Sequence, residues 1–384
     1  MPDPRSVPDW NAARRLFPVL ERWAHLNTAA FGPLPSVAAT AAREHLRTRN
    51  RNASLDFPEW FDRLERIRGK IGQLIGASPR DIAFCPNAGT GLSWLLRGIE
   101  WRRGDEILAF EHEFPNNLYA PQLLDALGVA FRPLPSPRTA FDADTLLDEV
   151  GPRTRLVLLS TVNYSNGLRA PLEEVAAELR RRSVLLCLDA TQSVGALRHD
   201  LEASPADFLV AHGYKWLMAP EGAGFAWIPP TTRSWLAPSI TSWRSHRDWM
   251  NFEHLHHGRP VLPESAAAYE GGVQPFSALF GLEASVDLIL RLGLDRIETR
   301  VLGLAERCRE IVAARGGVLH PAAKGPAASQ IVTASFPRLD SARLAAHLRE
   351  SRVAVSVRQG NLRVSPHFFN NETDLRRLSD ALAA

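Results

Sequence analysis

Residues 206–225 read ADFLVAHGYKWLMAPEGAGF and contain one lysine, Lys215, between two short apolar runs. These runs, at 207–213 and 222–228, predict buried strands, because near-continuous hydrophobic strands are typical of a sheet covered on both faces. Only three of the 45 cationic residues are lysines. A buried lysine can lose its proton whereas arginine cannot, so Lys215 is a candidate for covalent chemistry. The alternative is a lysine that extends from the end of a core strand to solvent.

Other apolar runs alternate with amphipathic stretches along the first two thirds of the chain. Further strands are predicted for DIAFCP (81–86), DEILAF (105–110), RLVLLSTV (155–162) and SVLLCLDA (183–190). Helices are predicted for GLSWLLRGI (91–99), NLYAPQLLDALG (117–128) and LEEVAAELRRR (172–182). This alternation predicts an α/β fold in three layers, with a mostly parallel sheet between helices.

Composition limits the class of protein. A chain of 384 residues with 45% hydrophobic content can build a large core and is expected to form two domains. The net charge of +3 indicates neither nucleic acid nor a membrane surface as a partner. Three cysteines in no metal-ligand spacing predict a reducing compartment, no disulfide framework and no metal site. No secretory signal or membrane-length apolar span is visible, so we expect a cytoplasmic protein.

The chain changes character after the last of these strands. Residues 229–265 are rich in Trp, His, Arg and Pro and predict a long excursion that lines or covers something. From residue 276 a long helical pattern leads to a final α+β segment. We expect a large domain over 23–270, a small C-terminal domain over 271–384, and an N-terminal segment, 1–22, that packs with the small domain.

Polar residues at the predicted strand ends suggest a ligand site, since open α/β sheets bind ligands there. In CPNAGTGLSWLL (85–96), Gly89 and Thr90 suit a phosphate at a helix N-terminus, although an ordinary helix cap has the same appearance. Asp189 lies at the end of an apolar strand, and a buried carboxylate needs a cation or donor, such as the protonated nitrogen of a pyridine cofactor. Asn163 ends another strand and could donate to a phenolic oxygen. Together with Lys215, these residues favour a cofactor site.

The order of the motifs EHEFPNN (111–117), VNYSNG (162–167), DATQSVG (189–195) and HGYKWL (212–217) resembles the class V aminotransferase family of fold-type I pyridoxal-phosphate enzymes. This family includes cysteine desulfurases, isopenicillin N epimerases, C–S lyases and kynureninases. The resemblance runs from HLNTAAFGPLP (25–35) to GNLRVSPHFFNNETDLRRL (360–378). It implies a seven-stranded, mostly parallel sheet with helices on both faces, a smaller α+β C-terminal domain, a homodimer, and pyridoxal 5′-phosphate as cofactor.

The resemblance also assigns roles at the cofactor. Lys215 would form the Schiff base and then act as acid and base at the substrate Cα, while Asp189 would keep the pyridine nitrogen protonated. The remaining cofactor contacts would be Gln192 and Asn163 at the phenolic oxygen, Phe114 on the ring face, and Gly89, Thr90, His212 and Tyr214 at the phosphate. His212 and Tyr214 could instead be packing residues, and Phe114 an ordinary core residue.

Further assignments concern the second subunit and the substrate. Gly272 and Val273, in YEGGVQPFSAL (269–279), would reach the phosphate of the neighbouring subunit, although Val273 lacks the hydroxyl of the threonine that relatives use. Arg363 would grip the substrate α-carboxylate with two hydrogen bonds. Arg358 would be a second substrate contact, with a surface salt bridge as the alternative. Asn27, in NTAAFG (27–32), is assigned to the substrate side as well.

The implied activity is that of an enzyme acting at the Cα of an α-amino acid through an external aldimine and a quinonoid. Aminotransferase-type chemistry is our prediction, because it is the family's generic activity, with a β-eliminating C–S lyase or an epimerase as alternatives. The desulfurase cysteine lies on a loop between the positions of Arg358 and Arg363, where this chain has Gln359 to Leu362 and no cysteine. Persulfide chemistry is therefore not expected.

Two other classes of function fit less well. A regulatory protein that only binds the cofactor would be expected to lack Lys215 or Asp189, and both are present. A dinucleotide-binding protein would need a G-x-G-x-x-G turn followed by an acidic residue, and that turn is missing.

Overall fold

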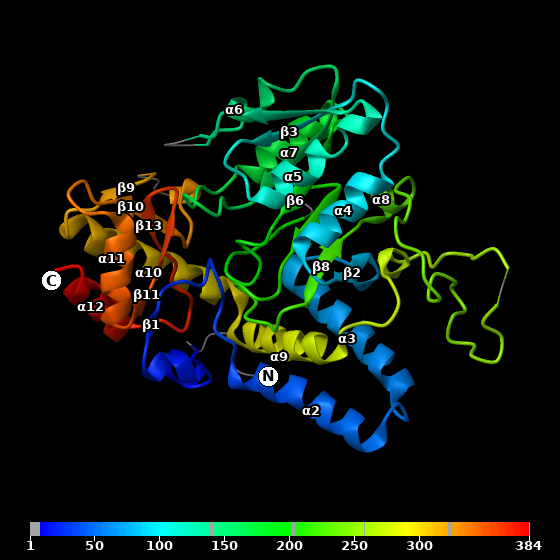
Figure 1. Ribbon diagram of the computed structural model, residues 1–384, viewed down its shortest axis with the longest axis horizontal. Coiled ribbons are helices and arrows are strands. Elements are labelled where there is room, and N and C mark those ends of the chain that lie inside the picture. The colour runs from blue at the N-terminus through cyan, green and yellow to red at the C-terminus, as the bar shows by residue number, and fades with distance from the viewer. Residues whose placement is uncertain (1–7, 138–140, 202–203, 257, 322–324, 384) are drawn as a thin grey trace.

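The computed structural model describes residues 8–137, 141–201, 204–256, 258–321 and 325–383. Within them, a seven-stranded sheet forms the centre of the larger part, and a four-stranded sheet lies near the C-terminus (Figure 1). The spatial order of the large sheet is β2 (Ile82–Cys85), β8 (Gly224–Trp227), β7 (Phe208–Ala211), β6 (Leu185–Asp189), β5 (Thr154–Ser160), β3 (Glu106–Phe110) and β4 (Ala130–Leu134). Of these seven strands, β8 runs in the opposite direction to the other six.

All six apolar runs predicted as strands are strands of this sheet, which confirms the mostly parallel α/β fold. The edge strand β4 was not predicted. Its sequence AFRPL has largely half-exposed side chains and a proline, as expected where only one side of the strand is paired. An apolar pattern is therefore absent from this strand, and the sequence alone gives no sign of it.

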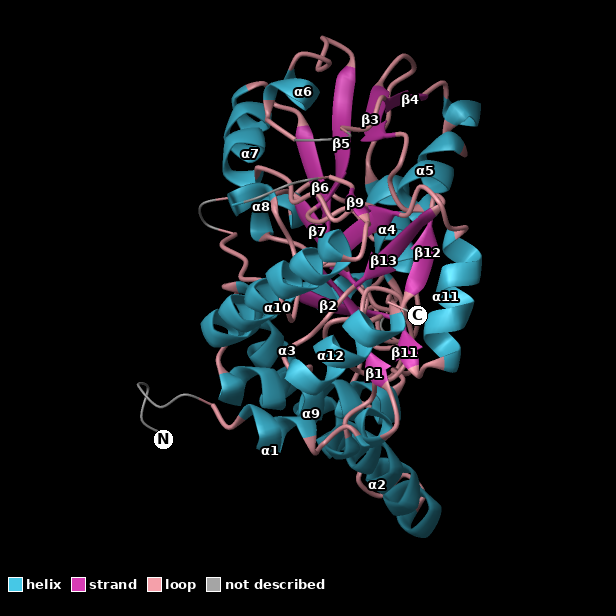
Figure 2. Cartoon of the chain, turned by 90° about the vertical axis from the view of Figure 1, so that its left-hand side faces the viewer, coloured by secondary structure: helices cyan, strands magenta, loops and turns pink. Residues whose placement is uncertain are grey.

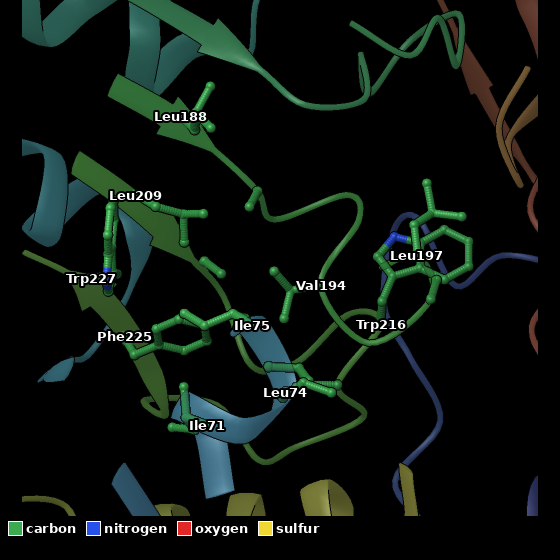
Figure 3. Packing of buried hydrophobic residues seen from close by; sticks show 14 of the residues in the cluster. Ile71, Leu74, Ile75, Leu188, Val194, Leu197, Leu209, Trp216, Phe225 and Trp227 are labelled. Carbon is green, nitrogen blue, oxygen red and sulfur yellow. The ribbon is translucent and has the colours of Figure 1, made fainter. Parts of the chain in front are cut away.

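Each face of the sheet packs against helices, because alternate residues of one strand point to opposite faces. On one face, Leu188 and Leu209 belong to a core cluster with α3 (Phe57–Ile75), α7 (Leu172–Arg181) and α9 (Phe276–Leu292). Figure 3 shows Leu209, Phe225 and Trp227 near Ile71 and Ile75 of α3. The next residues along the same strands, Cys187 and Val210, pack in a second cluster with α4 (Ala88–Gly98).

Two predicted helices are broken in the structure. The pattern at 117–128 becomes α5 (Pro115–Gln122) and a separate 3-10 turn, η3 (Asp125–Leu127). The pattern that begins at residue 276 is two helices, α9 and α10 (Leu294–Ala314), separated at Gly293. The φ angle of Gly293 is 82°, a conformation that favours glycine, so the helical path ends there.

The smaller part has an antiparallel sheet in the order β12 (Ser356–Arg358), β13 (Asn361–Val364), β10 (Val332–Ser335) and β9 (Val318–Leu319). Its core includes Cys308 of α10, Leu348 of α11 (Ser341–Glu350), Leu378 of α12 (Glu372–Ala381) and Leu362 of β13. Figure 2 shows β9, β12 and β13 beside α10 and α11. The N-terminal region joins this part, since β1 (Ala24–His25) pairs in parallel with β11 (Val353–Ala354).

The predicted division into 1–22, 23–270 and 271–384 stays a prediction. Two contacts link the N-terminal segment to the last helix region: Arg14 pairs with Asp374 at 2.6 Å, and Phe17 lies 4.7 Å from Phe369 between ring centroids. Helix α9, which follows residue 270, packs against α3 and α2 (Ser36–Asn52).

The remaining elements are α1 (Trp10–Arg14), η1 (Pro18–Glu21), η2 (Pro79–Asp81), α6 (Asp144–Leu147), α8 (Pro230–Arg233), η4 (Ala266–Tyr269) and η5 (Gly325–Ala327).

The described residues between α8 and η4 form no helix or strand, in agreement with the predicted excursion. Figure 1 shows this segment extending beyond the β2–β8 end of the large sheet. Arg244 anchors it: the side chain is buried and contacts Glu270 at 3.5 Å, while Glu270 also pairs with Arg68 of α3 at 2.6 Å. The excursion is therefore tied to the segment that follows η4.

Candidate active site

The carboxyl ends of β5, β6 and β7 meet at one edge of the sheet, and a small pocket opens there. Five of the predicted site residues line it together, whereas Gly89, Thr90 and Asn163 do not. The lining residues are Phe114, Ser160, Tyr164, Asp189, Thr191, Gln192, His212 and Lys215.

Lys215 is buried, with 6% of its surface exposed, so the alternative of a lysine that extends to solvent is wrong. Its Nζ lies 5.2 Å from the centroid of the Phe114 ring and forms no ion pair with any residue that the structure describes. Burial, the largest cause, lowers the pKa of this amine to about 8, with a raising effect from Asp189 and lowering effects from Arg363 and Arg358. A neutral, nucleophilic amine is therefore accessible near neutral pH.

The loop that carries Lys215 packs directly on the NTAAFG segment. The backbone N–H of Gly32 donates to the carbonyl of Tyr214 at 2.9 Å, and the ring of Phe31 stacks on Tyr214 at 4.6 Å. A Cβ atom at Gly32 would lie 2.0 Å from the Lys215 carbonyl oxygen. Only glycine fits this close approach, so the N-terminal segment helps to set the position of the lysine.

Gln192 joins the same two segments. Its Nε2 donates to the Ala29 carbonyl at 3.0 Å, and its Oε1 accepts a hydrogen bond from Trp216 Nε1 at 2.8 Å. The second N–H of the amide is the one available for the predicted contact with a phenolic oxygen, which stays a prediction.

Asp189 is 7% exposed and forms no ion pair with a described residue. Its Oδ1 accepts a hydrogen bond from the Thr191 backbone at 3.0 Å. Burial lowers the pKa of neighbouring His212 to about 4, so this imidazole is neutral at pH 7, and its Nδ1 is buried without a partner. A buried carboxylate without a cation and an unpartnered imidazole nitrogen are what a bound group with its own donors would satisfy.

Gly89 and Thr90 lie at the start of α4, outside the eight lining residues. Asn87 caps this helix: its Oδ1 accepts from the Thr90 backbone at 2.8 Å and from the Thr90 hydroxyl at 3.2 Å. Asn163 is also held locally, because its Nδ2 donates to the His112 carbonyl at 3.0 Å and its Oδ1 accepts from Ser165. The ordinary capping roles are thus present, and the phosphate and phenolic contacts stay predictions.

Arg363 is the most distinctive cation near the pocket. It is 1% exposed, its Nε donates to Ser356 Oγ at 3.1 Å, and one Nη donates to the Tyr164 carbonyl at 2.5 Å. The other Nη is buried without a partner, and no described carboxylate pairs with this guanidinium. Burial, followed by Arg358, lowers the pKa of Arg363 to about 9. An anionic group bound here would offset the cost of burying the Arg363 charge without a partner, so the geometry fits a carboxylate site.

The other assigned residues have clear positions. Arg358 lies on β12 and donates to the Val357 carbonyl at 2.8 Å, without a salt bridge to a described residue. The Oδ1 of Asn27 is buried without a partner. Gly272 accepts a hydrogen bond from Arg244 at 2.9 Å and Val273 is 63% exposed, and neither lines the pocket of its own chain. A role across a dimer stays a prediction.

Several pocket residues were not singled out from the sequence. Tyr164 and Thr191 lie inside the quoted motifs, directly after strands β5 and β6, and that position was the available signal. Glu113 lies behind the pocket: it is 2% exposed and accepts hydrogen bonds from the Ser160 backbone at 2.8 Å and from Asn117 at 3.1 Å. Burial raises the pKa of this carboxyl, and its charge in EHEFPNN was the only sign of it.

The described part of the chain holds no cluster of three or more His, Cys, Asp or Glu side chains suited to a metal ion. Its helices include none that is long and apolar enough to cross a membrane. The three cysteines are free and buried, and burial raises the pKa of Cys85 and Cys308 to about 12.

A family model for aminotransferase class-V matches residues 26–377. The chain belongs to this family. It is 27% identical over 403 residues to isopenicillin N epimerase of Streptomyces clavuligerus, with 99% of each chain covered. A probable cysteine desulfurase of Methanothermobacter thermautotrophicus is 25% identical over 310 residues, which cover 79% of this chain and 76% of that protein.

Among solved structures, the fold is similar to that of a C-DES variant with glycine covalently linked to its PLP cofactor. The TM-score is 0.89 at 24% identity, with 98% of this chain and 99% of that chain covered. This likeness confirms the predicted fold-type I architecture. The family depends on pyridoxal phosphate, and the residues at the pocket fit that group: a buried lysine, a buried unpaired Asp189 and an unpartnered His212 nitrogen.

Proposed function

We propose that this enzyme removes the Cα proton of an α-amino acid whose carboxylate is bound by Arg363. The observation that carries the proposal is the buried Arg363, which has an unpartnered Nη and donates to the carbonyl of Tyr164, a residue that lines the pocket of Lys215. Pyridoxal phosphate bound there supplies a positively charged ring that withdraws electrons from the substrate Cα. The protein's part is to hold the carboxylate, to accept the proton and to keep the ring charged.

Lys215 holds the cofactor and then takes the Cα proton on its Nζ, for which its pKa of about 8 suits it at neutral pH. Asp189 keeps a proton on the pyridine nitrogen. Gln192 and Asn163 would contact the phenolic oxygen, Phe114 would cover one ring face, and Gly89, Thr90, His212 and Tyr214 would bind the phosphate. Gly272 and Val273 of the partner subunit complete that phosphate site in a cytoplasmic homodimer.

Transamination is the first candidate for the overall reaction, because it is the family's generic outcome. In that reaction Lys215 would move the proton taken from Cα, water would supply the keto oxygen, and the amino group would stay on the cofactor while the product leaves as a 2-keto acid. Arg363 and Arg358 bind the carboxylate throughout, while Asn27 and the NTAAFG segment border the substrate.

Epimerisation is the second candidate, and Tyr164 favours it. Its ring meets that of Phe114 edge-on at 5.3 Å, and Tyr164 acts electrostatically on Arg363. Tyr164 lines the pocket together with Phe114 and Lys215, and in this candidate reaction its hydroxyl would return a proton to Cα on the face opposite Lys215. The similarity to isopenicillin N epimerases over almost the full chain is in line with this reading.

We further propose that the enzyme forms no persulfide on a cysteine of its own. The turn between β12 and β13 contains Gln359 and Gly360, and all three cysteines are buried with raised thiol pKa values. A thiolate that attacks sulfur must be exposed and ionised, and none of these is.

The test is a panel of L-amino acids incubated in D2O, with the products separated by chiral chromatography and 2-keto acids assayed. Deuterium at Cα is expected for the substrates under either candidate. A 2-keto acid formed once per active site identifies transamination, and a D-amino acid identifies epimerisation. Tyr164→Phe should abolish only the D-product while Cα exchange continues. Absence of Cα exchange across the panel would contradict the proposal.

A further inference from the structure

The backbone carbonyls on both sides of Lys215 are bonded to segments outside the lysine loop (residues 212–223). The Tyr214 carbonyl accepts from the Gly32 N–H at 2.9 Å. The Trp216 carbonyl lies 3.0 Å from Nε2 of His367, a fully buried residue in SPHFFNN (365–371). Each peptide group that flanks the lysine is therefore held from a part of the chain distant in sequence.

The position of the His367 proton follows from its two ring nitrogens. Nδ1 lies 2.8 Å from the backbone nitrogen of Phe368, which can only donate, so Nδ1 is the acceptor. Burial, the largest cause, lowers the pKa of His367 to about 4, so the ring is neutral at pH 7. Its single proton is then on Nε2, which donates to the Trp216 carbonyl.

The segment that carries His367 also carries Arg363, at the end of β13. Between them, the Ser365 N–H donates to the Leu26 carbonyl at 2.7 Å, and Ser365 Oγ accepts from the Ala29 N–H at 3.0 Å. The N-terminal segment bonded here is the one that contacts the lysine loop through Gly32. The guanidinium and the lysine loop are thus held by one pair of bonded segments.

We propose that His367 is a positioning residue, which fixes the amine of Lys215 relative to the carboxylate bound by Arg363. This inference rests on the proposed function, which assigns the Cα proton to the lysine and the carboxylate to the arginine. A substrate held by its carboxylate presents Cα at one place, and the amine must reach that place. His367 does not line the pocket, so it acts through the Trp216 carbonyl.

Two substitutions separate the two hydrogen bonds of the ring. In His367→Gln the amide nitrogen takes the place of Nε2 and keeps a donor for the Trp216 carbonyl, but no acceptor remains for the Phe368 N–H. In His367→Asn the shorter amide keeps an acceptor for Phe368 and does not reach Trp216. Each variant therefore loses one of the two bonds, and both should have a lower Tm.

The first readout is Cα deuterium exchange by the cofactor-loaded enzyme at saturating amino acid. His367→Asn should slow exchange at least about tenfold, since a misplacement of about 1 Å can cost roughly a hundredfold. The amino acid dissociation constant should change less than about twofold, because Arg363 is intact. His367→Gln should restore the exchange rate to within about threefold of wild type.

Ser285→Ala is the matched control. Ser285, on α9, is fully buried and its Oγ donates to the Met218 carbonyl of the lysine loop at 3.0 Å. Its loss removes a buried hydrogen bond from the same loop without involving the segment of Arg363. The Tm should fall while the exchange rate stays within about twofold of wild type.

The second readout is the rate at which cofactor-free protein binds pyridoxal phosphate covalently, which needs no substrate. His367→Asn should slow this step at least about threefold, since the amine is displaced from the pocket, and His367→Gln should not.

Wild-type exchange and uptake rates in His367→Asn would overturn the proposal. Equal losses in the Asn and Gln variants, or an equal loss in Ser285→Ala, would also overturn it, because they indicate general destabilisation. If His367→Asn does not fold, His367→Gln decides, since it must keep wild-type rates despite its lost bond to Phe368. Absence of Cα exchange in the wild-type enzyme would refute the proposed function instead, while the uptake rates still decide the role of His367.

Discussion

Arg363→Met changes ligand binding and stability in opposite directions if Arg363 is a substrate site. Methionine keeps much of the volume and removes the charge. Burial lowers the pKa of Arg363 to about 9 from 12.5, and at about 1.4 kcal/mol per pKa unit this is on the order of 5 kcal/mol against the charged form. Losing the hydrogen bonds to the Tyr164 carbonyl and to Ser356 Oγ costs about 1.5 kcal/mol each. We expect the substrate-free, cofactor-loaded variant to gain roughly 2 kcal/mol, seen as a Tm higher by a few degrees.

Substrate binding should suffer in the same variant. Removing one partner of a buried charge pair costs about 2–5 kcal/mol, which weakens amino acid binding by roughly thirtyfold or more. The assay follows the absorbance of the bound cofactor as one amino acid is titrated, and then as its decarboxylated amine is titrated. The amine should bind equally well to wild type and variant. Arg363→Lys should restore binding only in part, because an ammonium lacks the planar two-point grip.

Arg309→Met supplies the matched control for this experiment. Arg309 is another buried arginine of the smaller part, but it pairs with Glu306 at 3.2 Å and donates to the Ser329 carbonyl at 2.7 Å. Its loss should lower the Tm and leave amino acid affinity unchanged. The reasoning is refuted if Arg363→Met behaves like Arg309→Met, because Arg363 would then be a structural residue.

The rate at which cofactor-free protein binds pyridoxal phosphate covalently should rise about tenfold per pH unit and level off near pH 8, because only the neutral Lys215 amine attacks. A rate that continues to rise up to pH 10.5 would contradict the lowered Lys215 pKa of about 8. Gly32→Ala should lower the free energy of unfolding, measured by chemical denaturation, by about 2 kcal/mol or more and impair cofactor uptake, since its Cβ would lie 2.0 Å from the Lys215 carbonyl oxygen. Gly69 has open space around it, so Gly69→Ala should be neutral or stabilising. Equal effects of the two substitutions would refute the close-packing argument. Sedimentation should give twice the 42.5 kDa chain mass, and a fully loaded monomer would rule out the shared phosphate site.

The sequence predicts the elements that depend on neighbouring residues and misses those that depend on contacts between distant residues. Buried parallel strands need apolar runs, so six strands of the large sheet could be found, whereas the edge strand β4 has no such pattern. The break at Gly293 was missed, because an apolar pattern continues on both sides of it. Glycine at that position was the only local sign.

The site divides in the same way. Asp189 is the last residue of β6 and Lys215 lies shortly after β7, and parallel strands bring such residues to one edge, so their convergence could be predicted. The lack of an ion-pair partner for Arg363 could not be predicted, because it depends on which described residues, distant in sequence, lie near it.

The central claim is that Lys215 carries the cofactor, and the scarcity of lysine makes it directly testable. The chain has three lysines, at positions 70, 215 and 324. Lys70 pairs with Glu283 and Asp287, each at 2.8 Å, and Lys324 lies outside the described residues. Borohydride reduction of the purified protein, followed by peptide mass spectrometry, should find the phosphopyridoxyl group on the Lys215 peptide alone. Label on the Lys70 or Lys324 peptide instead, or on no lysine of cofactor-loaded protein, would contradict the account.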